Sequence, residues 1–154
     1  MTYPIEGYAC RYHYKDDGHD ILLPTILNDI PVQAGEIKML YQHDAARPIG
    51  RWHDIENRPD GLYVKGHISQ SHPDGQMVAA LLQDNIIDGL SIGFITKKAY
   101  QRKDGARIIQ AIDLREVSLV TFPMQKQARL NTAQKSFEHF LEYMALALSS
   151  GGAS

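Results

Sequence analysis

Cysteine is almost absent from this sequence, because Cys10 is the single example in 154 residues. One thiol cannot form an internal disulfide, and it cannot supply the several sulfur ligands of a cysteine-rich zinc site. Cys10 lies in an alternating apolar stretch, which is typical of a small buried side chain. The sequence therefore favours a reducing compartment.

Long apolar runs and an excess of basic charge are missing as well. No run approaches the roughly 18 apolar residues of a membrane-spanning helix, and the first residues do not have the pattern of a secretory signal. The 16 Lys and Arg residues against 18 Asp and Glu residues leave a formal net charge of -2. This balance gives no electrostatic footprint for nucleic acid or for an anionic membrane. We therefore expect a globular protein with neither nucleic acid nor membrane as a partner.

Nucleotide-binding and metal-binding motifs are also absent from the sequence. It contains no internal repeat, no P-loop and no G-x-G-x-x-G. It has seven histidines, but no H-E-x-x-H and no comparable pair of histidines four residues apart. We therefore expect no cofactor and no metal ion.

What the sequence does contain is a series of short segments in which apolar and polar residues alternate, the period of β-strands. These segments cover residues 5–13, 36–43, 47–55, 62–69, 108–112 and 116–122, with a further one around Ser91. Residues 76–87 instead have apolar side chains at helical spacing. Because the length suits one domain, residues 1–130 are predicted to form an α+β domain on a mostly antiparallel β-barrel.

The last part of the sequence has a different pattern. Residues 131–148 carry an apolar stripe at three- and four-residue steps, which predicts an amphipathic helix packed on the barrel domain. The same stripe could mediate self-association of the chain. It consists of Phe137, Phe140, Leu141, Met144 and Leu148. Residues 149–154 are small and polar, and they are predicted to form a flexible tail.

Residues 88–94, with the sequence DGLSIGF, are the most unusual stretch. They set Ser91 between Gly89 and Gly93, just after the predicted helix, where a strand begins. Glycines allow a tight bend and the close approach of another chain, and a nucleophile needs that access. The alternative is an ordinary strand serine in a glycine-rich turn, which the stretch alone does not exclude. The match to G-x-S-x-G does not indicate an α/β-hydrolase, because the order of helix and strand is inverted and only His139 lies downstream.

A serine nucleophile needs a base within hydrogen-bond reach and a third group that orients the base. His43 ends an apolar strand and precedes Asp44 and a small-residue loop, a position at the rim of a sheet that suits a functional side chain. Glu116 begins a strongly apolar strand and could orient such a base. The residues alone do not exclude a structural role for His43, and they leave Asp44 and Asp113 open as alternatives to Glu116.

Seven blocks within residues 5–130 together resemble the prohead (capsid maturation) proteases of tailed phages. They are IEGYA at 5–9, ILLP at 21–24, KMLYQHD at 38–44, PIG at 48–50, GLYVKG at 61–66, LSIGF at 90–94 and EVSLVTFP at 116–123. No single block is specific to the family, whereas their order and spacing together are. The resemblance implies a serine peptidase similar to the herpesvirus assemblins, with a β-barrel ringed by helices.

The same resemblance implies roles for three residues, since the family order is His, then Ser, then the third member. His43 is then the general base, Ser91 the nucleophile and Glu116 the orienting acid. The implied substrate is the major capsid protein or a scaffold segment, cleaved inside the immature phage capsid in the cytoplasm of the bacterial host. A non-catalytic module of the same fold, used in capsid assembly or scaffolding, is the alternative to an enzyme.

Two positions depart from the pattern of the family. Thr25 stands where a glycine usually follows Leu-Pro. After Pro123 the family usually continues with a small residue, asparagine and another proline, whereas this chain has MQKQA at 124–128. The second departure falls where the resemblance places the backbone donors for an oxyanion.

Overall fold

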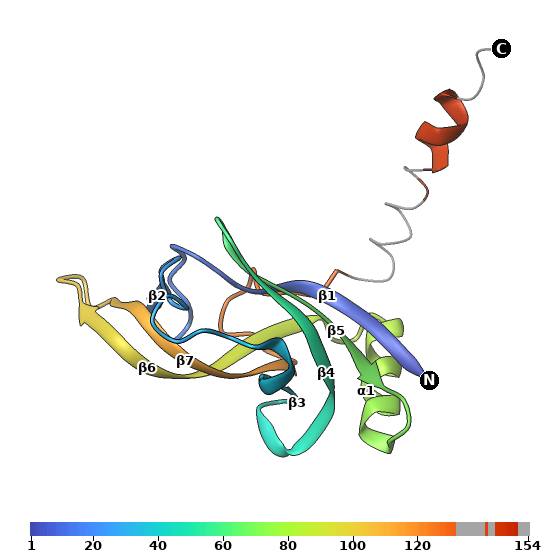
Figure 1. Ribbon diagram of the computed structural model, residues 1–154, viewed down its shortest axis with the longest axis horizontal. Helices are drawn as coiled ribbons and strands as arrows, with labels where there is room; N and C mark the ends of the chain where they lie inside the picture. The colour runs from blue at the N-terminus through green and yellow to red at the C-terminus, as the bar shows by residue number, and fades with distance from the viewer. Residues whose placement is uncertain (132–140, 142–143, 151–154) are drawn as a thin grey trace.

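The computed structural model describes residues 1–131, 141 and 144–150, and strands are its main secondary structure (Figure 1). The strands are β1 (Thr2–Arg11), β2 (Asp20–Leu22), β3 (Lys38–Tyr41), β4 (Asp44–Arg58), β5 (Gly61–Ser69), β6 (Gly89–Gln101) and β7 (Arg107–Val120). A 3-10 helix, η1 (Ala34–Glu36), precedes β3, and an α-helix, α1 (Pro73–Gln83), lies between β5 and β6. This architecture confirms the predicted fold class.

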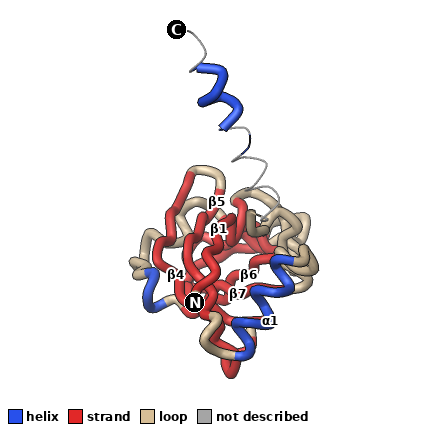
Figure 2. Tube along the Cα trace, turned by 90° about the vertical axis from the view of Figure 1, so that its right-hand side faces the viewer, coloured by secondary structure: helices blue, strands red, loops and turns tan. Residues whose placement is uncertain are grey.

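The strands form one curved sheet in the order β1-β5-β4-β3-β7-β2, with β6 paired to β7. The pairing is antiparallel except where β2 and β3 run parallel to β7. Because β6 pairs along nearly all of β7, β2 and β3 share the opposite edge of β7. The strands therefore curl around a common interior, with α1 at one side (Figure 2).

The open side of the barrel is bridged by residues 128–131, which we call the closing segment. Leu130 forms an antiparallel bridge with Gly7 of β1, and Arg129 forms one with Gly89 of β6. The approach at β1 is so close that a Cβ on Gly7 would lie 2.7 Å from the Leu130 Cα. Glycine is therefore required at position 7 for the closure.

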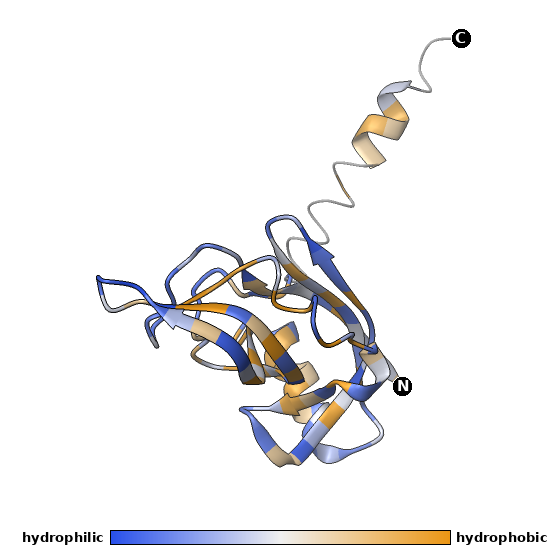
Figure 3. Cartoon of the chain, turned by 60° about the vertical axis from the view of Figure 1, so that its left-hand side comes forward, coloured by the Kyte–Doolittle hydropathy of each residue, from blue (hydrophilic) through white to orange (hydrophobic). Residues whose placement is uncertain are grey.

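The core lies between the curved strands, as the alternation in the sequence predicts. Trp52 of β4 is fully buried, and its indole Nε1 donates a hydrogen bond to the Val117 carbonyl of β7 at 3.2 Å. This bond satisfies the polar atom of the largest core side chain. Hydrophobic and hydrophilic residues alternate along the strands, whereas the tip of the β6–β7 hairpin is hydrophilic (Figure 3).

The predicted helix has different bounds in the structure. The helix predicted over residues 76–87 is α1, which begins at Pro73, a favoured first helical residue. It ends early because Asn85 adopts a positive φ of 56°, and the Asn85 and Ile86 N–H groups bond back to the carbonyls of Leu82 and Leu81. This pattern is a Schellman C-cap.

The two segments predicted at residues 108–112 and 116–122 are one strand, β7. The polar residues Asp113 and Arg115 suggested a break between them. Arg115 instead occupies a bulge, because Glu116 pairs with Gly93 and Leu114 pairs with the next residue, Phe94. A bulge of this kind explains a polar interruption inside one continuous strand.

The predicted C-terminal helix lies largely outside the described residues, and this includes Phe137 and Phe140. Residues 141 and 144–150 are helical and exposed, with Leu148 at 74% exposure. The predicted packing on the barrel and the predicted self-association remain predictions. Of the predicted tail, residues 151–154 lie outside the described part as well. No helix in the described part has the length and apolar character needed to cross a bilayer.

Candidate active site

Strand register brings Ser91 and Glu116 to one face of the sheet. Ser91 of β6 is paired with Ser118 of β7, and Gly93 is paired with Glu116. Cross-strand partners point to the same face, so all four residues share a face. The alternate residues, such as Val117, are part of the apolar core. The four residues therefore lie on the face of β6 and β7 opposite to that of Val117.

The sequence suggested that His43 lies at the end of a strand. In the structure it reaches this face from a turn. Tyr41 of β3 pairs with Asp44 of β4, which leaves Gln42 and His43 as a two-residue hairpin loop. Both have positive φ, 56° and 58°, at positions where hairpins favour Asn and Gly. Such conformations at other residues cost of order 1–3 kcal/mol each and are concentrated at functional sites.

The imidazole of His43 is in contact with Glu116. Its Nδ1 atom forms a hydrogen bond with Glu116 Oε1. The second carboxylate oxygen, Oε2, accepts a hydrogen bond from the Ser118 hydroxyl, and Ser118 is fully buried. The Glu116 side chain is only 13% exposed, so two fixed partners hold both of its oxygens in a largely covered position.

Gly93 makes room for this carboxylate. A Cβ on Gly93 would lie 2.7 Å from the Cδ atom of Glu116, which is closer than carbon atoms tolerate. The second glycine of G-x-S-x-G thus has a packing reason: it lets the acid lie flat across β6 toward His43.

Ser91 and His43 line one cavity of about 350 Å³ beside β6. Ser91 is 4% exposed. Within the part of the chain that the structure describes, the ring of His43 is hydrogen-bonded to Glu116 and not to Ser91. Catalytic hydrogen bonds are often long before substrate is bound, so the shared cavity is the relevant relation between the two side chains.

Cys10 lines the same cavity, and its thiol is a potential nucleophile beside the Ser91 hydroxyl. It is buried, as predicted from the sequence. Burial raises the pKa of its thiol to about 12. A thiol must lose its proton to be a good nucleophile, so Cys10 is inert at neutral pH and Ser91 has no competitor of this kind.

Comparison with known proteins identifies the family. The family described as caudovirus prohead serine protease matches residues 1–143. The chain belongs to this family. The prohead protease of Enterobacteria phage HK97 is 33% identical over 138 residues, which cover 87% of this chain and 61% of that protein. The prohead protease of Escherichia phage T5 is 28% identical over 102 residues, 66% of this chain and 48% of that protein. The chain thus spans less than two thirds of the length of these two prohead proteases.

Solved structures share the fold of this prohead protease family member at low sequence identity. The capsid assembly protease of bacteriophage T4 has a TM-score of 0.64 at 18% identity, over 78% of this chain and 82% of that one. The KSHV protease in complex with a hexapeptide phosphonate inhibitor has a TM-score of 0.61 at 12% identity, over 94% of this chain and 77% of that one. The predicted likeness to herpesvirus proteases is therefore confirmed at the level of the fold.

Of the three carboxylates that the sequence left open, the structure brings Glu116 to His43. Asp44 instead accepts a hydrogen bond from the backbone N–H of Ala46 at 2.9 Å. Asp113 pairs with Arg115 at 3.2 Å. Neither of these two carboxylates is bonded to the His43 ring, although Asp44 is its neighbour in sequence.

Four of the other histidines lie elsewhere in the described structure. His53 and His67 stack on each other, with Nε2 and Nδ1 2.5 Å apart, and His13 and His19 lie in turns with positive φ. Within residues 1–131, 141 and 144–150, no group of three or more His, Cys, Asp or Glu side chains is placed to hold a metal ion.

Sequence reasoning missed Ser118 and Gln125. Ser118 follows Glu116 by two residues, so strand periodicity could have placed it on the same face. Gln125 lies in the stretch that departs from the family pattern. Its side-chain amide accepts from the Arg11 N–H at 2.6 Å and donates to the Arg11 carbonyl at 2.9 Å. It thereby caps the end of β1 at the wall of the cavity, a contact that no local sequence signal predicts.

Proposed function

We propose that this chain is a serine endopeptidase in which Ser91 is the nucleophile, His43 the general base and Glu116 the orienting acid. The observation that supports this most is the bond between His43 Nδ1 and Glu116 Oε1 beside a cavity that Ser91 shares with His43. A histidine oriented by a largely covered carboxylate, with a serine lining the same cavity, is the arrangement that activates a hydroxyl for attack.

The contact with Glu116 defines which imidazole nitrogen does the chemistry. A carboxylate accepts hydrogen bonds, so Nδ1 of His43 carries the proton toward Glu116 and Nε2 is left with its lone pair. Nε2 is then the atom that takes the Ser91 proton. The Glu116 charge also stabilises the imidazolium that this transfer creates.

The reaction follows from these positions. Ser91 Oγ attacks the scissile carbonyl carbon while its proton passes to His43 Nε2. The tetrahedral oxyanion collapses, the C–N bond breaks, and Nε2 returns the proton to the leaving amine. A water then enters, and its oxygen attacks the acyl carbon while one of its protons passes to His43 Nε2. The ester C–Oγ bond breaks, Nε2 returns that proton to Ser91 Oγ, and the carboxylic acid product leaves.

The substrate we propose is the major capsid protein or a scaffold segment, cleaved inside the immature phage capsid in the bacterial host. Two facts support this choice: the chain belongs to the prohead protease family, and its fold is that of a phage capsid assembly protease. The alternative, a non-catalytic assembly module, gives no reason for a strained His43 loop directed at a buried glutamate.

A fluorophosphonate reagent separates the enzyme from the assembly module. It reacts with activated serines, so we expect one adduct per chain, mapped to Ser91 by peptide mass spectrometry. Ser91→Ala should give no adduct, and Ser71→Ala, at an exposed loop serine, should give the full adduct. Wild-type protein that remains unmodified, or is modified elsewhere, would contradict the proposal.

The substrate is tested separately by co-expression with the capsid and scaffold proteins of the same phage. We expect defined fragments of one of them with the wild type and intact protein with Ser91→Ala. Labelling at Ser91 without any fragment would be consistent with a peptidase but would contradict the proposed substrate.

A further inference from the structure

The loop that carries His43 is fixed through its other residue, Gln42. The backbone N–H of Gln42 donates to the Leu119 carbonyl at 2.9 Å. Its side-chain Nε2 donates to Thr121 Oγ1 at 2.6 Å, and the Thr121 N–H donates to Gln42 Oε1 at 3.2 Å. The last register pair of β3 and β7 is Tyr41 with Leu119. Gln42 therefore continues this pairing beyond the strand ends, partly with its side chain.

These hydrogen bonds hold a loop whose backbone conformation is unfavourable for its residues. Gln42 and His43 both have positive φ, which side chains other than Gly, Asn and Asp rarely adopt. Such a loop keeps its shape only when neighbouring groups hold it. Glu116 lies on β7, so the His43–Glu116 contact depends on how this loop is placed against β7.

We propose that Gln42 is a positioning residue, whose bonds to Thr121 hold the loop in the conformation that places His43 on Glu116. This inference rests on the proposed function and adds a residue to it. Gln42 and Thr121 are both exposed, so their bonds exchange readily with water and contribute little to global stability. What they supply is the position of the imidazole.

The main test uses two variants of Gln42 that differ in their effect on the loop. Gln42→Met keeps the length of the side chain and loses both hydrogen bonds. Gln42→Gly also loses them, but glycine adopts positive φ without strain. We expect kcat to fall about 10- to 100-fold in Gln42→Met, as for a catalytic group displaced by about 1 Å, with KM and the melting temperature unchanged.

The Gln42→Gly variant distinguishes the effect of the hydrogen bonds to Thr121 from the effect of backbone strain at position 42. A fall in kcat comparable to that of Gln42→Met is expected if the bonds to Thr121 are what places His43. A wild-type rate in Gln42→Gly would overturn the inference, because it would show that backbone freedom alone suffices. Gln101→Met, the same substitution at the exposed far end of β6, is the matched control and should react as the wild type does.

The partner residue gives a second, independent set of variants. Thr121→Val removes the hydroxyl and should slow the reaction about fivefold, the equivalent of one ordinary hydrogen bond. Thr121→Ser restores the hydroxyl and should restore most of the rate. The double variant Gln42→Met/Thr121→Val should be no slower than Gln42→Met, since both changes remove one shared contact.

Proton NMR of the imidazole gives a readout that does not depend on activity. The Nδ1 proton of His43, bonded to a carboxylate, should resonate far downfield and disappear in Glu116→Gln. It should broaden or shift in Gln42→Met and persist in Gln101→Met. A general loss of stability would lower the melting temperature with the rate, and that outcome too would overturn the positioning role.

The outcomes for the two proposals are distinct. Absence of labelling at Ser91 in the wild type would contradict the proposed function. The imidazole resonance would still test whether Gln42 positions His43. Labelling of Gln42→Met at the wild-type rate, with an unchanged resonance, overturns the role of Gln42 and leaves the proposed function intact. If Gln42→Met does not fold, Thr121→Val and Thr121→Ser are judged by the same criteria.

Discussion

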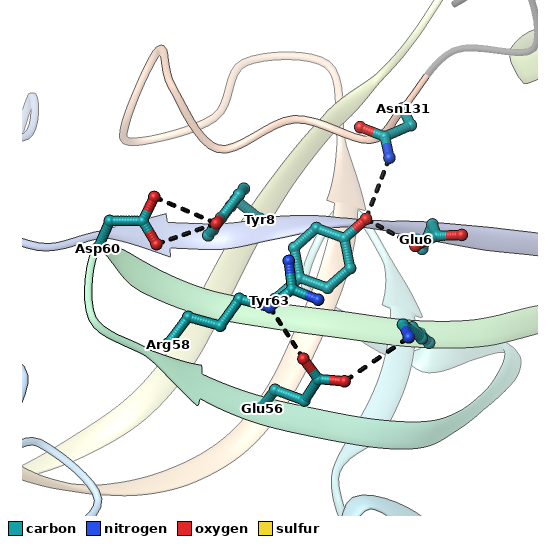
Figure 4. Close-up of polar contacts among 8 residues, drawn as sticks. Glu6, Tyr8, Glu56, Arg58, Asp60, Tyr63 and Asn131 are labelled. Atoms are coloured by element: carbon teal, nitrogen blue, oxygen red, sulfur yellow. Dashed lines mark hydrogen bonds and ion pairs between the residues drawn. The ribbon is translucent and has the colours of Figure 1, made fainter. Parts of the chain in front are cut away.

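Two polar networks of the barrel are built differently. The first is the candidate site on β6 and β7. The second crosses β1, β5 and β4, where Tyr8, Tyr63 and Glu56 lie in one cross-strand row. Figure 4 shows it with its neighbours Glu6, Arg58, Asp60 and Asn131. We call this second group the tyrosine network.

In the tyrosine network most members have more than one partner. Asp60 accepts hydrogen bonds from both Tyr8 and Arg11, and Glu56 pairs with both Arg58 and Lys65. The Arg58 guanidinium also lies 3.6 Å from the centroid of the Tyr63 ring. Such a group retains most of its interactions when one side chain is removed.

The candidate site is a single row of contacts. Ser118 bonds one oxygen of Glu116 and His43 bonds the other, so no second partner takes over if one is lost. The comparison teaches that polar side chains can be placed for stability or for position. Redundant contacts suit the first purpose, and a linear series suits the second.

The strongest way to break the site is Ser91→Ala. It removes one oxygen atom, so the fold and the melting temperature should be retained. The cleavage rate should fall by roughly 10⁴ to 10⁶, as it does when a serine peptidase loses a member of its triad. Cleavage of capsid or scaffold protein at a near wild-type rate would show that another residue is the nucleophile.

Glu116→Gln should have the second largest effect. It keeps the shape of the side chain and loses the charge that, in the proposed triad, orients and stabilises the imidazole, so we expect a loss of roughly 10² to 10⁴ in kcat. Asp44→Asn is the matched control, because Asp44 bonds the Ala46 N–H rather than the ring. If Asp44→Asn is the slower variant at one pH on one substrate, Glu116 is not the orienting acid.

Gly93→Ala tests whether the acid needs open space above β6. The added methyl would meet the Glu116 carboxylate, which must then move away from His43, so we expect kcat to fall about 100-fold. Gly35→Ala is the control, because its methyl would meet only the mobile end of Arg51, at 3.1 Å. Equal rates for the two variants would argue against this role of Gly93.

Tyr63→Phe should have a small effect, and on stability alone. It removes the hydroxyl that donates to Glu6 at 2.6 Å and accepts from Asn131 at 3.0 Å. Because the ring and its contact with Arg58 remain, we expect a loss of about 1 kcal/mol in the free energy of unfolding, with an unchanged cleavage rate. Stability is measured by urea unfolding and activity by the cleavage rate of the same protein. A large drop in the cleavage rate would contradict the distinction between the two networks.

The smallest expected effect is the pH dependence of Glu56. Its hydrogen bond with Arg58 is the main cause that lowers its pKa below the ordinary 4.5. A carboxyl with a lowered folded pKa stabilises the fold above its unfolded pKa, and this contribution is lost as the pH falls through the folded value. The stability difference between the wild type and Glu56→Gln should therefore shrink below about pH 4.5. A difference that is constant from pH 7 to pH 3 would contradict this.

The sequence predicted the barrel because each strand alternates in a way that reflects one buried face. Its errors arose where the bounds of an element depend on a partner strand or on the backbone dihedral angle of one residue. The polar residues Asp113 and Arg115 suggested a break between two strands. They lie at a bulge within β7, which can be seen only from the pairing with β6. Helix α1 was placed too late because its end depends on the backbone of Asn85.

The candidate site divides in the same way. The residues alone suggested a rim position for His43 and left Ser91 open between a nucleophile and an ordinary strand serine. The resemblance to the family supplied roles for both residues and for Glu116. The loop conformation of His43, the hydroxyl of Ser118 and the amide of Gln125 could not be derived from any single stretch. Each of them depends on a neighbour on another strand or on backbone dihedral angles.

The closing segment has a consequence for how the protein is made. Gly7 of β1 is bridged by Leu130, so the first strand of a nascent chain emerges from the ribosome long before its partner does. Until then the facing edges of β1 and β6 have free backbone groups that can pair with other chains. Nascent chains stalled before residue 128 should therefore be protease-sensitive and bind chaperones. Release of residue 131 from the exit tunnel should make them resistant in a single step.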